Sequence, residues 1–175
     1  TTTTVFERLG SAVDLDAAWT SQTVNLNSFA GQSVRILIEA ADADTASLVE
    51  AAVDDVSITT SDGPTVTPTT TATFTPSPTS TPTFTPTPTS TTPPGGDLFF
   101  DNFETNLGWT SNPNGTDSAT TGLWERGDPE ATDSNGPKQL GNTVSGSNDL
   151  VTGRLAGASA GVHDIDGGVT SIRSP

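Results

Sequence analysis

The middle of the chain is an uncharged Thr/Pro-rich stretch, and this stretch restricts the fold more than any other feature. Nine of the 13 prolines lie between positions 64 and 94, interleaved with Thr and Ser, and no charged residue occurs between Asp62 and Asp97. Proline fixes φ and removes a backbone donor, so such a sequence favours an extended polyproline II conformation and cannot bury a core. We therefore divide the chain into a first flank (1–62), a stalk (63–95) and a second flank (96–175).

The stalk contains a ten-residue repeat. The frame Thr-Phe-Thr-Pro-x-Pro-Thr-Ser-Thr occurs at 73–82 and again at 83–92. Fully extended, residues 64–94 of the stalk would span roughly 90 Å at ~3.1 Å per residue. Thr and Ser mixed with Pro are typical of O-glycosylated stalks, and a bare linker is the alternative. The predicted acceptors of O-linked glycans are Thr73, Thr75, Thr79, Thr81, Thr83, Thr85, Thr87 and Thr89.

The first flank predicts β-strands. Residues 34–40 are rich in β-branched and aliphatic side chains and follow a turn signal at 29–32, and residues 19–26 alternate roughly between apolar and polar. In residues 48–58 the apolar positions change phase at Asp54 and Asp55, which indicates a bulge or a bend.

The second flank predicts further short strands between turns rich in Gly, Asn, Asp and Ser. We expect them at 98–104, 107–109, 123–125, 150–152 and 169–175. Short strands at this spacing indicate a β-sandwich, so the predicted fold class is all-β. No signal peptide or membrane-spanning apolar run is present, and we interpret the chain as a piece of an exported protein whose signal lies upstream.

The charge balance narrows the classes of partner. Six basic residues against 21 acidic ones give a formal net charge of −15. Nucleic acid and anionic membrane surfaces are therefore poor partners, because binding to phosphate depends on Lys and Arg. Calcium, cationic surfaces and neutral polysaccharide remain open. The chain has no cysteine, which excludes disulfides and thiolate metal sites.

The second flank contains four motifs: Asp-Asn-Phe-Glu-Thr at 101–105, the Gly-Trp pair at 108–109, Thr-Gly-Leu-Trp-Glu-Arg-Gly-Asp-Pro at 121–129 and Gly-Pro-Lys-Gln-Leu-Gly at 136–141. Together they resemble the opening half of a jelly-roll module found in the C-terminal region of secreted bacterial zinc carboxypeptidases. The first flank resembles the closing half through Phe-Ala-Gly-Gln-Ser-Val-Arg-Ile at 29–36 and Val-Glu-Ala-Ala-Val-Asp-Asp-Val at 49–56.

This resemblance implies two partial jelly-roll segments from successive modules, joined by the stalk, in a secreted protein outside the cell or on its surface. Neither half should close a sandwich alone, since an open half exposes apolar faces and unpaired strand edges. We therefore expect the flanks to dock on each other, either within one chain or between chains as self-association through open β-edges.

The chain lacks the zinc ligands that a carboxypeptidase of this kind needs for its reaction. A zinc carboxypeptidase needs two His and one Glu as ligands, whereas His163 is the one histidine here. We therefore predict no zinc site and no enzyme in this segment. Gly-Ala-Ser-Ala-Gly at 157–161 fits the written form of a nucleophile elbow, but that motif needs a strand-to-helix turn, and we interpret it as a loop of small residues.

The resemblance also implies a structural calcium site. In jelly-roll modules the first and last strands are often neighbours, and the carbohydrate-binding relatives commonly bridge them with calcium, which takes six to eight oxygens. The candidate ligands are Glu104 on the first strand and Asp54 and Asp55 on the last. A second candidate is the pair Asp164 and Asp166, which lacks the bidentate Glu of an EF-hand loop. The alternative for all five is an ordinary surface or turn carboxylate.

These observations predict a non-catalytic accessory and spacer region of a secreted zinc-carboxypeptidase-like protein. One alternative is a structural component of an extracellular fibre or sheath built on an O-glycosylated Thr/Pro rod. Another is a polysaccharide-binding module that uses Trp19, Trp109 and Trp124, although tryptophans of a β-sandwich more often belong to the core.

Overall fold

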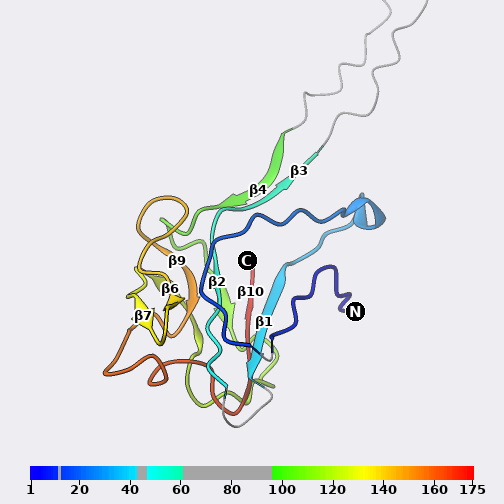
Figure 1. Cartoon of the computed structure of the whole chain (residues 1–175). Helices are drawn as coiled ribbons and strands as arrows, with labels where there is room; N and C mark the ends of the chain where they lie inside the picture. The colour runs from blue at the N-terminus through cyan, green and yellow to red at the C-terminus, as the bar shows by residue number, and fades with distance from the viewer. Residues whose placement is uncertain (12, 43–46, 61–95) are drawn as a thin grey trace, which may run out of the picture. The chain divides into compact units, whose positions relative to one another are not determined.

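A computed structural model describes residues 1–11, 13–42, 47–60 and 96–175 (Figure 1). The repeat and all eight predicted glycosylation sites lie outside these residues. The described part is all-β, as predicted, with one 3₁₀ turn, η1 (Asn27–Phe29). Its strands are β1 (Leu37–Asp42), β2 (Ala52–Val53), β3 (Val56–Thr59), β4 (Asp97–Asp101), β5 (Thr110–Ser111), β6 (Trp124–Gly127), β7 (Thr132–Asp133), β8 (Pro137–Gln139), β9 (Asp149–Thr152) and β10 (Gly168–Arg173).

The chain divides into two compact units. Unit 1 comprises Thr1–Val56 and Asp101–Pro175, and unit 2 comprises Ser57–Phe100. Unit 1 contains two three-stranded sheets, in the orders β1-β10-β5 and β2-β9-β6. In each sheet a strand of the first flank pairs with a strand of the second, so the flanks complete each other within one chain.

The registers of these pairs are antiparallel. Along β1 and β10, Leu37 lies opposite Arg173 and Asp42 opposite Gly168. In the other sheet Val53 of β2 lies opposite Leu150 of β9. The open edges expected of each isolated half are therefore paired here with strands of the other half.

Both sheets contribute to one hydrophobic core. Its buried members are Phe103, Trp124, Leu150 and Ile172, and Ile38, Ala40, Ala51, Val53, Val56 and Trp109 pack against them. Burying a large apolar side chain contributes about 1.5–3 kcal/mol. Two small antiparallel sheets therefore share one core, and the β-sandwich with jelly-roll connectivity stays a prediction.

Asp101 organises one end of this core. Its Oδ1 accepts a hydrogen bond from the backbone N–H of Phe103 (2.8 Å) and its Oδ2 accepts one from Trp109 Nε1 (2.8 Å). The rings of Phe103 and Trp109 then lie with their centroids 5.6 Å apart. The local sequence Asp-Asn-Phe, followed by Gly-Trp, therefore builds a satisfied turn under the core.

Several expected strands differ from the observed ones. The change of phase at Asp54 and Asp55 is confirmed, because β2 ends at Val53, β3 begins at Val56, and Asp55 has φ of 50°. The expected strands at 98–104 and 107–109 are displaced, since β4 ends at Asp101 and β5 begins at Thr110.

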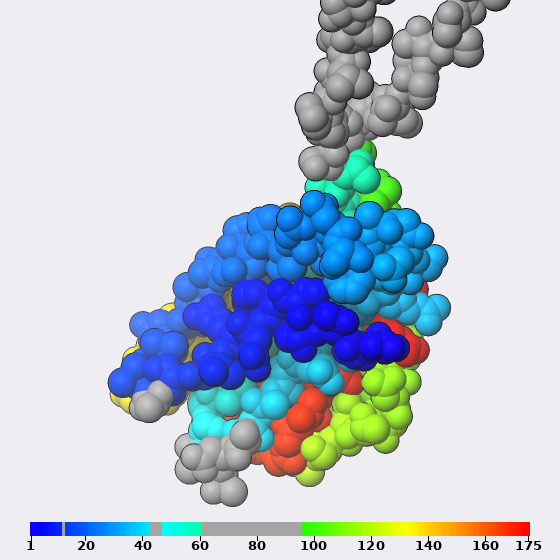
Figure 2. Space-filling model, turned by 90° about the vertical axis from the view of Figure 1, so that its right-hand side faces the viewer, coloured from blue at the N-terminus to red at the C-terminus, as the bar shows by residue number. Residues whose placement is uncertain are grey.

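The strand predicted at 19–26 is wrong. These residues have no regular secondary structure and pair with no strand among the described residues. Their neighbourhood is held by single contacts, such as Ala17 N–H to the Pro137 carbonyl (2.7 Å) and Trp19 Nε1–H to the Asn142 carbonyl (2.9 Å). Figure 2 shows the N-terminal residues, in dark blue, as a band on the surface of unit 1. Alternation alone cannot make a strand without a partner for its backbone.

The described part of unit 2 consists of the residues that flank positions 61–95 in the sequence. Strands β3 and β4 form a two-stranded sheet. Beyond it, Thr60 N–H donates to the Gly96 carbonyl (3.1 Å), and Gly96 N–H donates to Thr60 Oγ1 (3.1 Å). The residues on either side of 61–95 are therefore hydrogen-bonded to each other. No helix in the described ranges is long and apolar enough to cross a membrane.

Candidate functional site

The three predicted calcium ligands meet at one loop, which connects β8 to β9 and which we call the β8–β9 loop (residues 140–148). Asp54 Oδ2 accepts hydrogen bonds from the backbone N–H groups of Val144 (2.8 Å) and Ser145 (3.0 Å). Asp55 Oδ1 accepts one from Ser145 Oγ (2.7 Å). Both aspartates come from the first flank, so they anchor a loop of the second flank.

Glu104, which belongs to the second flank, binds the same loop. Its Oε1 accepts hydrogen bonds from the N–H groups of Ser147 (2.8 Å) and Asn148 (2.6 Å). These bonds stabilise the ionised carboxylate and hold the pKa of Glu104 below its usual value. Gly146, with φ of +66°, leaves room for the Glu104 carboxyl group where a Cβ would stand.

The structure thus brings together Asp54, Asp55 and Glu104 around one loop. N–H and O–H groups of that loop donate hydrogen bonds to all three carboxylates. In the described ranges no group of three or more His, Cys, Asp or Glu side chains has the spacing to hold a metal ion. Calcium held by these three residues stays a prediction.

A fourth carboxylate, Asp149, was missed by the sequence reasoning. It is the first residue of β9 and is fully buried (0 % exposed). Neither of its carboxylate oxygens has a hydrogen-bond partner in another described residue. Burial raises the pKa of Asp149 to about 7, and the negative charges of Asp54 and Asp128 raise it as well.

The strand registers explain why these acids are close. Gly127, the last residue of β6, lies opposite Asp149, and Asp128 follows it. Because Val53 lies opposite Leu150, the next residue of the first flank, Asp54, lies across from Asp149. The three aspartates therefore lie at the same end of the sheet, where β6 and β2 end and β9 begins.

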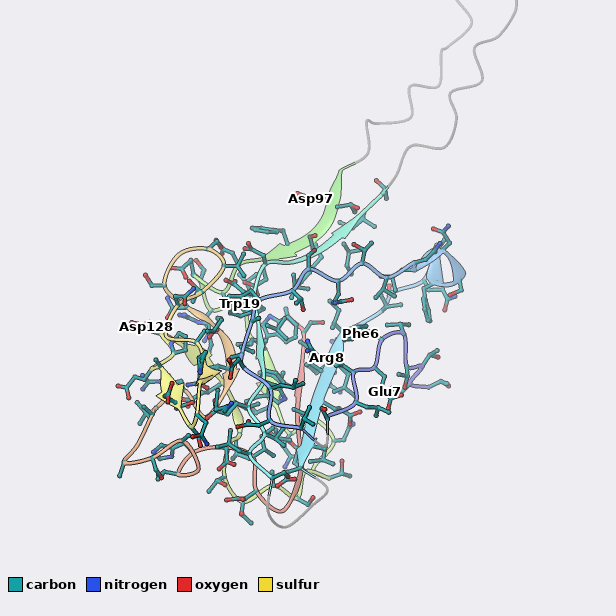
Figure 3. All side chains as sticks on the ribbon, in the orientation of Figure 1. Phe6, Glu7, Arg8, Trp19, Asp97 and Asp128 are labelled. Atoms are coloured by element: carbon teal, nitrogen blue, oxygen red, sulfur yellow. The ribbon has the colours of Figure 1, made fainter. Side chains whose placement is uncertain are left out.

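A cavity of about 230 Å³ lies beside these strand ends. It is lined by Asp128, Gly141, Asn142, Thr143, Gly146 and Ser147. Figure 3 shows Asp128 on the side of unit 1 where β6 and β7 lie. Apart from the two glycines, every lining side chain carries an oxygen atom, and none is basic.

The two residues of the second calcium candidate, Asp164 and Asp166, have different surroundings. Asp164 is buried (3 % exposed), its Oδ1 has no partner among the described residues, and burial raises its pKa. Asp166 Oδ2 instead accepts a hydrogen bond from Thr121 Oγ1 (3.1 Å) at an isolated bridge between these two residues. Calcium at this pair also stays a prediction.

The small-residue motif at 157–161 and the tryptophans Trp109 and Trp124 have structural roles. Residues 157–161 form turns, with Val162 N–H bonded to the Ser159 carbonyl (3.1 Å), as expected for a loop. Trp124 (3 % exposed) and Trp109 belong to the core, whereas Trp19 lies against the β8–β9 loop. The three tryptophans therefore do not form one aromatic platform.

Comparison of the chain with protein-family models, with curated proteins and with solved structures gives no match.

Proposed function

We propose that this chain is a non-catalytic accessory and spacer region of a secreted multidomain protein, of the zinc-carboxypeptidase kind that its motifs resemble. The observation that carries the proposal is the pairing of the flanks, β1 with β10 and β2 with β9. Segments that resemble the closing and opening halves of one kind of module have complementary strands, as halves of such a module should. The one histidine of the sequence leaves any zinc-dependent reaction to another part of a parent chain.

The spacer role follows from the choice of partner for each flank. Within this chain Thr60 and Gly96 are hydrogen-bonded, so the stalk adds no separation between the flanks. When each flank instead pairs with the missing half of its own module, the stalk links two sandwiches and spans up to roughly 90 Å. Glycans on its threonines would stiffen that link and protect it from proteolysis, outside the cell or on its surface.

The proposal is tested in the parent protein by deletion of the whole region. We expect hydrolysis of small soluble peptides to be unchanged, because the region supplies no catalytic group. Retention on the cell surface or activity on large insoluble substrates should fall. Loss of activity on small peptides after this deletion would contradict the accessory role.

A second candidate, polysaccharide binding, is favoured by one cavity. It has a volume of about 330 Å³ and is lined by Asn106, Trp109, Ser111, Glu125, Arg126, Leu150 and Ile172. Ligand pockets combine apolar and aromatic walls with a few polar groups, and this cavity offers one tryptophan ring beside amide and charged side chains. Calorimetric titration with neutral oligosaccharides tests it: the Glu125→Gln change should weaken binding, and absence of heat with every glycan would exclude this role.

The third candidate is the fibre or sheath component. Its basis, the glycosylated decapeptide, lies outside the described residues, so it rests on the sequence alone. Open β-edges that pair between chains would supply its self-association. Sedimentation of the chain over a range of concentrations tests this: concentration-dependent assembly supports the fibre, and a monomer at all concentrations argues against it.

A further inference from the structure

We propose that β8 and the start of the β8–β9 loop form a binding site for an acidic Asp-x-Asp segment. Residues 14–19 of the same chain, which we call the strap, occupy this site here, and the strap of a second copy of the chain can take their place. The proposal goes beyond the accessory role and does not depend on it. It also differs from pairing between open strand edges, because the strap contains no strand.

The site is centred on Lys138 of β8, whose side chain is almost completely buried (5 % exposed). Its ammonium group lies 2.8 Å from Asp14 Oδ1, and it donates hydrogen bonds to Asp16 Oδ1 and to the Leu15 carbonyl, both at 3.2 Å. The three donors of the ammonium group therefore meet acceptors on three successive residues. Because a buried charge is costly unless it is paired and hydrogen-bonded, Lys138 requires an acidic occupant.

The backbone on either side of Lys138 binds the same segment. The Ala17 N–H donates to the Pro137 carbonyl (2.7 Å), and Trp19 Nε1–H donates to the Asn142 carbonyl (2.9 Å). These contacts fix the direction of the strap along β8. The site therefore recognises an extended segment with a defined sequence, and not a negative charge alone.

Gly136 adapts the site to a carboxylate. It precedes Pro137 and has φ of +123°, a conformation that residues with a Cβ rarely adopt. A Cβ at this position would collide with the Asp16 carboxyl group. Glycine therefore makes the turn into β8 and also leaves the space that the second acid of the Asp-x-Asp segment fills.

The strap itself is exposed and separable from the sheets. The side chains of Asp14 and Asp16 are 61 % and 63 % exposed, and Figure 2 shows the N-terminal segment, in blue, on the surface of unit 1. Residues 20–36, which connect the strap to β1, contain the 3₁₀ turn η1 and no strand. Fully extended they would reach roughly 55 Å. The strap can therefore leave its site without breaking a sheet, and it can reach another copy.

Charge at long range does not explain such binding. The chain carries a formal net charge of −15, so it repels an acidic segment until the segment reaches Lys138. Moderate salt screens this repulsion beyond about 8 Å. Diffuse association of an acidic peptide with an acidic chain is therefore disfavoured, and binding depends on the contacts at the site.

The first experiment uses a fluorescently labelled peptide of residues 13–20 as the second strap. Its acceptor is the full chain with Asp14→Asn and Asp16→Asn, in which the chain's own strap is weakened and Lys138 is intact. In wild type the tethered strap competes at an effective concentration in the millimolar range. We therefore expect the peptide to bind the double variant at least about tenfold more tightly than it binds wild type, measured by anisotropy in about 0.15 M salt.

Two controls separate recognition from loss of charge. A peptide with both aspartates replaced by asparagine should bind the double variant at least about tenfold more weakly than the native peptide, because the ammonium group loses its ion pairs. The chain with Glu7→Gln and Asp97→Asn loses two exposed carboxylates outside the strap and should bind the native peptide as wild type does.

The second experiment tests exchange between full chains. The Lys138→Gln chain has an intact strap and a defective site, whereas the Asp14→Asn, Asp16→Asn chain has a defective strap and an intact site. Each should sediment as a monomer when alone. Their mixture should form a one-to-one complex, since one chain supplies the strap and the other the site. If Lys138→Gln does not fold, wild-type chain mixed with the double variant takes its place, and the complex should form at higher concentration.

Several results would overturn the proposal. They are absence of peptide binding to the double variant, equal binding of the native and asparagine peptides, and absence of a complex in the mixture. Assembly of each variant alone to the same extent as the mixture would assign self-association to open strand edges and would likewise overturn it. None of these results bears on the peptide-hydrolysis test of the accessory role.

Discussion

Two buried aspartates of this chain occupy opposite environments. Asp101 (3 % exposed) accepts hydrogen bonds from Phe103 N–H and Trp109 Nε1–H, one on each oxygen. Asp149 has no such donors among the described residues. The first carboxylate is therefore a structural part of the core. The second is buried without a hydrogen-bond donor from another described residue, and this burial favours its protonated form.

Replacing Asp101 should be costly. Asp101→Ala removes the acceptor of the buried Phe103 N–H and of the part-buried Trp109 Nε1–H, and each lost hydrogen bond of this kind costs about 1–3 kcal/mol. We expect the free energy of unfolding to fall by about 2–5 kcal/mol, measured by urea denaturation. Asp97→Ala, at the exposed start of β4, is the control and should change stability by less than about 0.5 kcal/mol. Equal effects of the two changes would contradict the role of Asp101.

Asp149 should make stability fall as the pH rises, provided that divalent ions are absent. Its folded pKa of about 7 lies above that of an unfolded aspartate, so its contribution is fully present below about pH 4 and is lost as the pH passes 7. Urea midpoints measured from about pH 4 to about pH 8 should therefore decline in wild type relative to Asp149→Asn. Glu104, whose pKa is lowered, contributes in the opposite direction in both proteins. Parallel profiles of the two proteins would show that Asp149 titrates normally.

At the scale of single residues, the sequence predicted some of the carboxylates around the β8–β9 loop. Asp54, Asp55 and Glu104 were found because they lie in recognisable strand motifs, and the structure brings them to one loop. Asp149 was not found, since its burial depends on a loop and on strands distant in sequence. An acid beside Leu-Val-Thr reads as an ordinary strand start.

Among the elements, the β8–β9 loop depends on a close fit that one residue tests. Gly146 has φ of +66° and faces the Glu104 carboxyl group, whereas Gly115 has φ of +70° and faces nothing within 4 Å. We expect Gly146→Ala to cost about 1–3 kcal/mol more than Gly115→Ala, because both changes carry the same backbone strain and only the first displaces Glu104. Thermal unfolding of the two variants measures the difference. Equal shifts in Tm would mean that Glu104 does not hold this loop.

Strands were predictable where local pattern and long-range pairing agree. The expected strands at 150–152 and 169–175 correspond to β9 and β10, which are the central strands of the two sheets. The segment 19–26 alternates as well, but no strand among the described residues pairs with it. Pairing is a property of the partner as much as of the segment, so alternation overestimates strands at the periphery.

For the whole chain, the pairing of the flanks was foreseen as one of two arrangements. The sequence indicated complementary halves, but it did not determine whether they meet within a chain or between chains. In the structure both sheets are completed within one chain, and Thr60 is hydrogen-bonded to Gly96 at the base of the stalk. The stalk then closes a long loop between β3 and β4.

Shortening this loop should leave the fold intact and make it more stable. We expect replacement of residues 61–95 by a four-residue turn to raise the free energy of unfolding by about 2 kcal/mol, since closure entropy grows with the logarithm of loop length. The measurement is a urea denaturation curve, with sedimentation to establish that the shortened chain is monomeric. A Gly/Ser segment of the original length is the control and should match wild type, which separates loop length from the Thr/Pro sequence. If the flanks instead pair between chains, the short turn would prevent each from reaching its partner, and the variant would unfold, or assemble only at high concentration.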